Sequence, residues 1–204
     1  TRNGERVAFS GFSYEVPVVA SRKVQEYPAK SANCDIHIGV LHGELSTAQG
    51  RYAPFSIPEL REKGYDYWAL GHIHTCQEVS SKPCAWYSGT TQGADRKESG
   101  PKRALLVEIT PGNAPEIQFI ESSMMEWTEV ELSISETARL ETLPYLIVEA
   151  LPSPAKRSLV TLHLLTQESI YSREDLKQLT EVVNGFLEEK RSLVTVMSIR
   201  EQVT

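Results

Sequence analysis

The stretch GYDYWALGHIH, at residues 64–74, decides how the first half of the chain folds. Tyr65–Leu70 is short, aromatic and apolar, which is typical of a buried strand set between glycines. His72 and His74 follow directly after Gly71, and in extended chain residues i and i+2 point to the same side. The two histidines are therefore predicted to converge at the end of a strand.

A second strand ends in the same way. Asp35–Leu41 (DIHIGVL) is apolar and runs directly into His42 and Gly43. If the two strands are parallel, His42, His72 and His74 lie at the carboxyl edge of one sheet, where ligands bind in open α/β folds. Neutral imidazole suits zinc, manganese, iron and cobalt, and three such ligands leave positions open for water or substrate. The sequence thus predicts a metal site from these three residues.

The remaining candidate ligands are weaker. Three imidazoles carry no negative charge, so a dinuclear site needs carboxylates, and neither Asp35 nor Glu44 has the spacing of a bridging ligand. An isolated H-x-H motif is a weak signal, and its alternative is a pair of structural histidines. His37 lies mid-strand and is predicted to be structural, while His163 is predicted on the outer or partner-facing side of a later strand. The three cysteines are expected to be reduced and in the core, with only Cys76, two residues after His74, considered as a ligand: Cys34, Cys76 and Cys84.

Composition and charge limit the class of protein. The chain has 204 residues, 40% hydrophobic and 24% charged, which excludes a disordered or fibrous chain. Apolar runs such as Ser158–Leu165 fall far short of the ~20 residues that a membrane span needs. No basic, apolar leader opens the sequence, and with the expected reduced thiols this predicts a cytoplasmic protein.

The net charge of −6 is uneven. Residues 1–120 hold 13 basic and 13 acidic side chains, whereas residues 121–204 hold 8 and 14. An acidic segment binds polyanions poorly, so any role with nucleic acid requires local basic patches, a metal or a partner. One basic cluster lies in a loop with Asp95 and Glu98, and is interpreted either as a solvated turn or as a phosphate contact: Arg96, Lys97, Lys102 and Arg103.

The patterning predicts a mixed α/β (α+β) fold with two domains, 1–120 and 121–204. The first is predicted to be strand-rich, with a bulge at Gly11 and one short helix, Ser56–Lys63, opened by a capping box of Ser56 and Glu59. The second is predicted as a small β-α-β-α-β module with strands at 129–134, 158–165 and 192–199 and helices at 135–150 and 172–190. The same capping pattern is expected at the last helix, where Ser172 precedes Asp175 by three residues.

Several motifs together resemble the second half of a calcineurin-like metallophosphoesterase. They are L-H-G at 41–43, Y-A-P-F at 52–55, the stretch at 64–74, Y-S-G-T-T-Q-G at 87–93 and E-S-G-P-K-R-A-L-L-V-E-I at 98–109. In detail the chain resembles DNA repair exonucleases of the SbcD type, in their YhaO-like branch. Residues 121–204 are similar, more weakly, to the capping domain that follows the phosphoesterase core of that family.

The resemblance implies two metal ions, usually manganese, with His42 and His72 on the second ion and His74 on the first. The G-D-x-x-D and G-N-H-[DE] motifs of the family do not occur in this sequence, and its one D-x-H tripeptide, Asp35–His37, belongs to the strand in which His37 is predicted to be structural, so the bridging aspartate and the catalytic histidine are expected to be missing. The expectation is therefore a C-terminal portion of a longer enzyme, inactive alone, with an open sheet edge or apolar face that self-association covers.

The function that the resemblance implies is a manganese-dependent exonuclease acting on DNA ends in double-strand break repair, with an SbcC-like ATPase subunit as partner. Two alternatives remain open: a calcineurin-like phosphodiesterase for small molecules, and a non-catalytic module for dimerisation or ATPase docking. No membrane role is expected.

Overall fold

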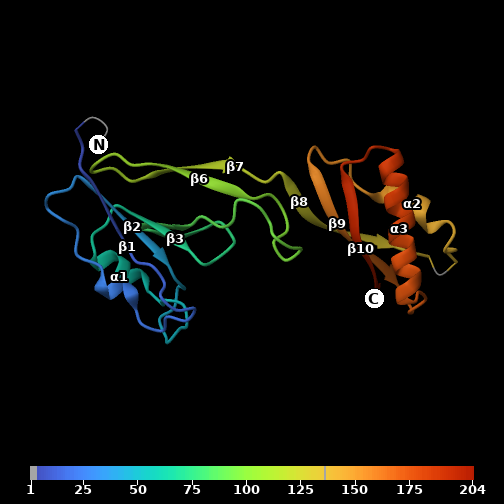
Figure 1. Cartoon of the computed structure of the whole chain (residues 1–204), viewed down its shortest axis with the longest axis horizontal. Helices are drawn as coiled ribbons and strands as arrows, with labels where there is room; N and C mark the ends of the chain where they lie inside the picture. Colours follow the sequence, from blue (N-terminus) through green and yellow to red (C-terminus); the bar gives the residue numbers. More distant parts are fainter. Residues whose placement is uncertain (1–3, 136) are drawn as a thin grey trace. The chain divides into compact units, whose positions relative to one another are not determined.

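The computed structural model describes residues 4–135 and 137–204. They form two compact units (Figure 1). One contains the chain up to Thr91 together with Lys102–Ser122, and the other contains Gln92–Pro101 and Ser123–Thr204. Among the described residues, none of the helices combines the length and apolar character needed to cross a bilayer.

The first unit is built on a five-stranded sheet in the order β1-β2-β3-β5-β4. All neighbours in it are parallel except β4 and β5. The predicted strands are present, but β1 ends at Gly11 in unbroken register with β2, so the predicted bulge is wrong. The strands are β1 (Val7–Gly11), β2 (Ile36–His42), β3 (Tyr67–Gly71), β4 (Gln77–Ser81) and β5 (Cys84–Tyr87).

One face of this sheet carries the core of the unit. Trp68 of β3 is fully buried together with Leu41 and Phe55. Gly39 leaves the space for that indole, because a Cβ atom there would lie 2.3 Å from Trp68 Cε3. The same core includes Val24 of the 3-10 helix η1 (Lys23–Glu26) and Leu60 of α1 (Ile57–Glu62), whose predicted capping box of Ser56 and Glu59 is confirmed.

The other face is only partly covered. The antiparallel strands β6 (Arg103–Glu108) and β7 (Glu116–Glu121) lie over its β5 side, where Phe119 meets Trp86 with ring centroids 5.7 Å apart. Towards β1 the face is bare, since Phe9 is 68% and Val40 49% exposed. This matches the expectation of an exposed apolar face beside an open edge strand.

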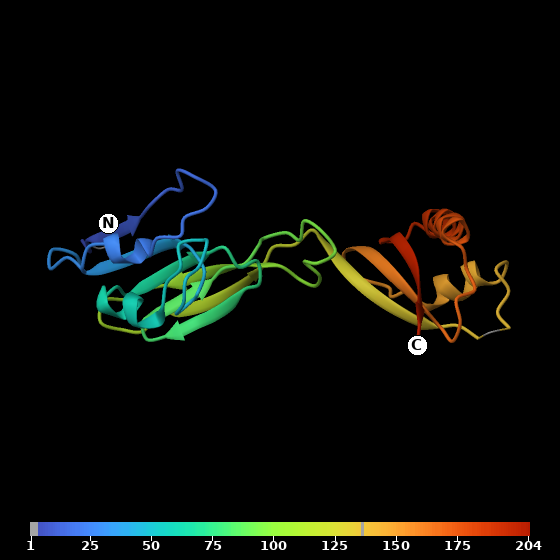
Figure 2. The same cartoon turned by 90° about the horizontal axis from the view of Figure 1, so that it is seen from below.

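The second unit has the predicted order of elements. Its strands are β8 (Met125–Ser133), β9 (Arg157–Thr166) and β10 (Val194–Val203), all parallel, in the sheet order β10-β9-β8. The helices α2 (Leu143–Ala150) and α3 (Arg173–Glu189) contact each other on one face of this sheet (Figure 2). Their apolar sides and the strands form a single core that contains Ile147, Leu162 and Val183.

One predicted helix is too long. The prediction placed it at 135–150, but α2 begins only at Leu143, with Pro144 in its first turn. Proline fits the first helical turn because its missing N–H needs no partner there, whereas it is costly further inside a helix. The chain from Thr137 to Thr142 forms turns instead, and residue 136 lies outside the described residues.

Candidate metal centre

The two strands that end in histidine lie side by side. β2 and β3 are parallel, and His42, the last residue of β2, is in register with Gly71, the last residue of β3. The sequence places His72 directly after this pair, so both histidines lie at the carboxyl edge of the sheet, as their positions at strand ends predict. A backbone hydrogen bond continues the pairing beyond His42, since Gly43 N–H donates to Gly71 O at 3.2 Å.

The imidazoles of this edge are close to one another. The ring centroids of His42 and His72 are 5.4 Å apart in an edge-to-face arrangement. Burial lowers the pKa of His42, and the nearby charges of His72 and His74 lower it further. His42 is therefore neutral at neutral pH, which is the form of imidazole that ligates a metal.

His72 has an unusual backbone. Its φ of 108° lies in the left-handed region, which residues other than glycine rarely adopt. Holding a histidine in this conformation costs of the order of 1–3 kcal/mol of stability. The ring of Tyr52 packs beside its imidazole, with centroids 4.9 Å apart. Such strain persists where surrounding contacts hold it, and it is common at functional sites.

The turn that carries His42 is held by tyrosines that the sequence analysis did not single out. Tyr14 Oη donates to His42 O at 2.7 Å. Tyr87 Oη donates to Gly43 O at 2.7 Å and accepts from Leu45 N–H at 3.1 Å. Burial raises the pKa of Tyr87 to about 12, so the phenol keeps its proton and both hydrogen bonds at any working pH.

Glu44 supports the same turn through one oxygen of its carboxylate, Oε1. Its carboxylate accepts from the backbone N–H groups of Tyr52, at 3.0 Å, and Arg51. These bonds lower the pKa of Glu44. Asp35 lies at the opposite end of β2, where it accepts from Arg6 N–H at 2.7 Å.

Glycines pack close to this edge and to the turn that follows it. A Cβ atom on Gly43 would lie 2.4 Å from Ala53 O, and one on Gly71 would lie 3.0 Å from His42 Nδ1. Gly89, with a φ of 72°, passes so close to the turn after His74 that a Cβ atom would lie 2.8 Å from His74 O. The Y-S-G motif at 87–89 therefore supplies the tyrosine that holds the turn after His42 and the glycine beside which the backbone of His74 can lie.

The donors fit one part of a metal site and not the whole of it. Neutral imidazole nitrogen suits manganese and zinc, and the edge gathers such groups. Within residues 4–135 and 137–204, however, no cluster of three or more His, Cys, Asp or Glu side chains has an arrangement that could hold an ion. Other ligands, carboxylates above all, would have to complete the centre.

The remaining candidates lie elsewhere. His37 is buried in β2, stacks on Tyr65 with centroids 3.8 Å apart and bonds to Ser10 Oγ at 2.9 Å through Nε2. His163 alternates along β9 with Leu162 and Leu164, which belong to the core under the helices. The half-buried thiol of Cys76 has a pKa that burial raises, which disfavours the thiolate that a metal would need.

The predicted phosphate-binding cluster is divided between the two units. Arg96 and Lys97 belong to the second unit, and Lys102 and Arg103 to the first. In the loop itself, Asp95 accepts from Lys97 N–H and Glu98 accepts from Ala94 N–H, so both acids shape the turn. Arg103 lies over the Phe119 ring, 4.9 Å from its centroid. The role in DNA contact stays a prediction.

Comparison with known proteins finds similarity to a curated protein. No family model matches the chain. A curated protein of Bacillus subtilis (strain 168), named "Uncharacterized metallophosphoesterase YhaO", is 35% identical over 146 residues, which are 70% of this chain and 35% of the relative. The matched part of the chain is thus similar to part of a metallophosphoesterase. The mixed α/β fold, with several sheets and few helices, is consistent with part of such an enzyme. The chain spans about a third of the relative's length.

Proposed function

We propose that the chain is part of a metal-dependent phosphodiesterase of the calcineurin-like, SbcD type that acts on DNA ends in double-strand break repair. The observation that carries the proposal is the meeting of His42 and His72 at the carboxyl edge of parallel strands, with His42 held neutral. The relative's name, a metallophosphoesterase, supports the same chemistry.

In this proposal His42 and His72 hold one divalent ion and His74 the other, with manganese as the expected metal. A pair of such ions supplies charge stabilisation for the phosphodiester and lowers the pKa of a bound water. This chain's own residues position imidazoles: Tyr14, Tyr87 and the backbone of His72 fix the turns that present them. The bridging carboxylate and the catalytic histidine would come from outside these 204 residues, so the chain alone is proposed to be inactive.

DNA binding is proposed to involve the basic residues near the loop. Arg96 and Lys97 are the better candidates, because the acids beside them are engaged with backbone N–H groups. Neutralising the cluster in the full-length protein should weaken DNA binding and flatten its salt dependence, since each phosphate contact releases counterions. An unchanged salt slope would reject this contact.

The proposed partners are DNA, an SbcC-like ATPase subunit and a second copy of the chain. The proposed setting is cytoplasmic, where the three free cysteines would stay reduced.

The experiment for the proposed activity uses the full-length protein with manganese. We expect nucleotide release from double-stranded DNA ends, and loss of that release in His72→Asn with unchanged folding by circular dichroism. His163→Gln serves as the matched histidine variant, because His163 lies on β9 and is not among the proposed ligands, and it should retain activity. Inactivity on DNA combined with hydrolysis of cyclic or mononucleotide esters would favour the small-molecule alternative.

A non-catalytic role has one observation in its favour. The described residues do not form a metal centre by themselves. A module for dimerisation or ATPase docking would need no metal, and the full-length protein would then lack hydrolytic activity on every phosphodiester. Manganese-dependent hydrolysis by that protein would exclude this alternative.

A further inference from the structure

The edge strand β10 is open along one side from Ser198 onward, whereas at Val196 the side chain of Asn184 on α3 donates to the backbone C=O at 2.8 Å and accepts from the N–H at 2.9 Å. β10 has β9 as its one neighbour in the three-stranded sheet. The register shifts at Met197, and from Ser198 to Val203 the strand runs in unbroken register with Thr161–Thr166. On its other side this segment presents alternate backbone N–H and C=O groups with no strand beside them, which is the arrangement that accepts an additional strand.

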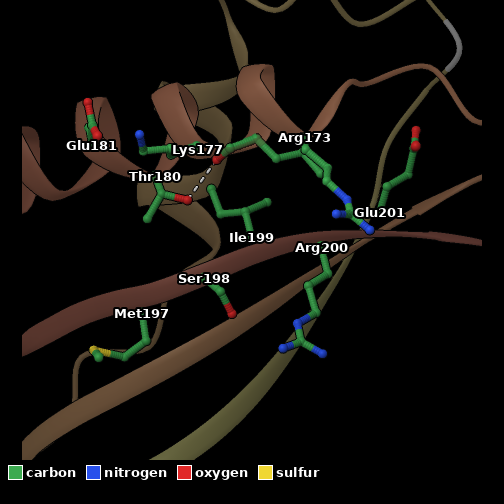
Figure 3. Close-up of a pocket in the computed structure, with 10 residues that line it drawn as sticks. Arg173, Lys177, Thr180, Glu181, Met197, Ser198, Ile199, Arg200 and Glu201 are labelled. Atoms are coloured by element: carbon green, nitrogen blue, oxygen red, sulfur yellow. Dashed lines mark hydrogen bonds between the residues drawn. The ribbon is translucent and has the colours of Figure 1, made fainter.

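A groove runs along this edge beneath α3 (Figure 3). Its volume is about 510 Å³. Leu176 and Ile199 give it an apolar floor, and Met197, 49% exposed, stands at one end. A helix beside the free edge of a strand forms a slot in which an extended peptide can hydrogen-bond to the strand and pack its side chains on the helix.

The groove is flanked by cations in an acidic part of the chain. Arg173 and Lys177 of α3 and Arg200 of β10 are exposed and form no ion pair within the described residues. Of the two acids in the lining, Glu201 is turned to the loop before α3, where it accepts from Ile170 N–H at 2.7 Å and Ser169 Oγ at 2.8 Å. Glu181 lies on the helix beyond Lys177 (Figure 3). Three cations therefore face one unengaged carboxylate.

We propose that this groove binds an extended acidic peptide segment of a partner protein, which adds as a fourth strand to the free edge of β10. The backbone of the peptide pairs with Ser198–Val203. Side chains on one face of the added strand pack on Leu176 and meet Lys177, and those on the other face meet Arg200.

The same features disfavour other occupants. A second copy pairing β10 with β10 would bring Arg173, Lys177 and Arg200 close to their own counterparts, which is unfavourable for like charges. A nucleic acid would meet the cations but would leave the apolar floor and the backbone donors and acceptors of β10 without matching groups. An acidic peptide would contact the cations, the apolar floor and the backbone groups of β10 together.

The test selects a phage-displayed library of random octapeptides on the 204-residue chain. We expect enriched peptides that alternate β-branched or aromatic residues with glutamate or aspartate. The best of them, labelled with fluorescein, should bind at least about tenfold more weakly to the Lys177→Glu/Arg200→Glu chain. The matched control is Lys190→Glu/Arg157→Glu, which has the same change of charge at exposed positions of the unit and should bind as the unaltered chain does. Methylation of alternate backbone nitrogens on one edge of the peptide should abolish binding.

Four results would overturn the proposal. They are failure to enrich any acidic sequence, equal binding to the two charge-reversed chains, indifference to backbone methylation, and efficient cross-linking of Ser198→Cys chains to each other without peptide.

Discussion

His72 has a strained backbone and is also one of the proposed metal ligands. Its φ of 108° is a conformation that glycine adopts freely, yet the sequence has an imidazole there, beside that of His42. A side chain that is retained against its own backbone preference is consistent with a role other than stability. The position can therefore be tested for stability and for metal binding separately.

Replacement of His72 by glycine and by alanine should separate the two effects. Both variants lack the imidazole, but only His72→Gly relieves the positive φ, so it should be more stable than His72→Ala by about 1 kcal/mol. Denaturant unfolding of the first unit, followed by its tryptophan fluorescence, measures the difference. Equal stability of the two variants would show that the backbone is not strained at this position.

Tyr87 offers a second test at the residue scale. Tyr87→Phe leaves Gly43 O and Leu45 N–H without their partner in a buried setting, and should lower the free energy of unfolding by about 1–3 kcal/mol. The control is Tyr145→Phe, because that ring is 62% exposed and loses no described hydrogen bond. If both variants unfold at the same denaturant concentration, Tyr87 does not clamp the His42 turn.

At the scale of elements, α1 is tied to the loop before η1 by one ion pair. Arg22 Nη2 and Nε both donate to the Glu59 carboxylate, which also accepts from Ser56 as the cap of α1. The hydrogen bonds from Arg22, followed by those from Ser56 and Gln25, lower the pKa of Glu59 to about 2.

This pair should make stability depend on pH. Because the folded pKa lies below the usual value of 4.5, the stabilisation is complete above that value and is lost as pH falls towards 2. It amounts to about 3 kcal/mol at most, from 1.36 kcal/mol per pKa unit. Unfolding of the unaltered chain and of Glu59→Gln should therefore differ most at about pH 6 and converge near about pH 2. A difference that stays constant over this range would contradict the assignment.

Sequence patterns predicted some elements well and others poorly, for local reasons. Both capping boxes were predictable because Ser56 with Glu59, and Ser172 with Asp175, satisfy helix ends through residues three apart. β4 was not predicted, since its sequence, QEVSS, has no apolar alternation and it becomes a strand only by pairing with β5. The positions of the site histidines followed from strand ends, whereas Tyr14 and Tyr87 are far from His42 in sequence and only the fold brings them to it.

At the scale of the whole molecule, the bare part of the first sheet is the feature with the largest consequence. Phe9, Val40 and Val7 are exposed on neighbouring strands, and β1 is the open edge of that sheet. Apolar surface of this kind is normally covered by another part of a protein or by another molecule. The proposed self-association would cover it.

The chain should therefore associate with itself in a way that depends on Phe9. Sedimentation velocity over a range of concentrations should show species larger than the 22.8 kDa monomer, and Phe9→Glu should shift the equilibrium towards the monomer. Phe119→Glu is the matched variant, because Phe119 is 51% exposed but lies on β7. A monomer at all concentrations, or equal effects of the two variants, would contradict association through this face.

The most direct test of the central claim is manganese titration of the chain, followed by NMR of its five histidine rings. Paramagnetic Mn²⁺ broadens only the resonances near its site, even when binding is weak, so a partial site is detectable. We predict that the ring signals of His42, His72 and His74 broaden at the lowest manganese concentrations, while those of His37 and His163 persist. Equal broadening of all five rings, or none at millimolar manganese, would contradict the assignment of these three histidines as metal ligands.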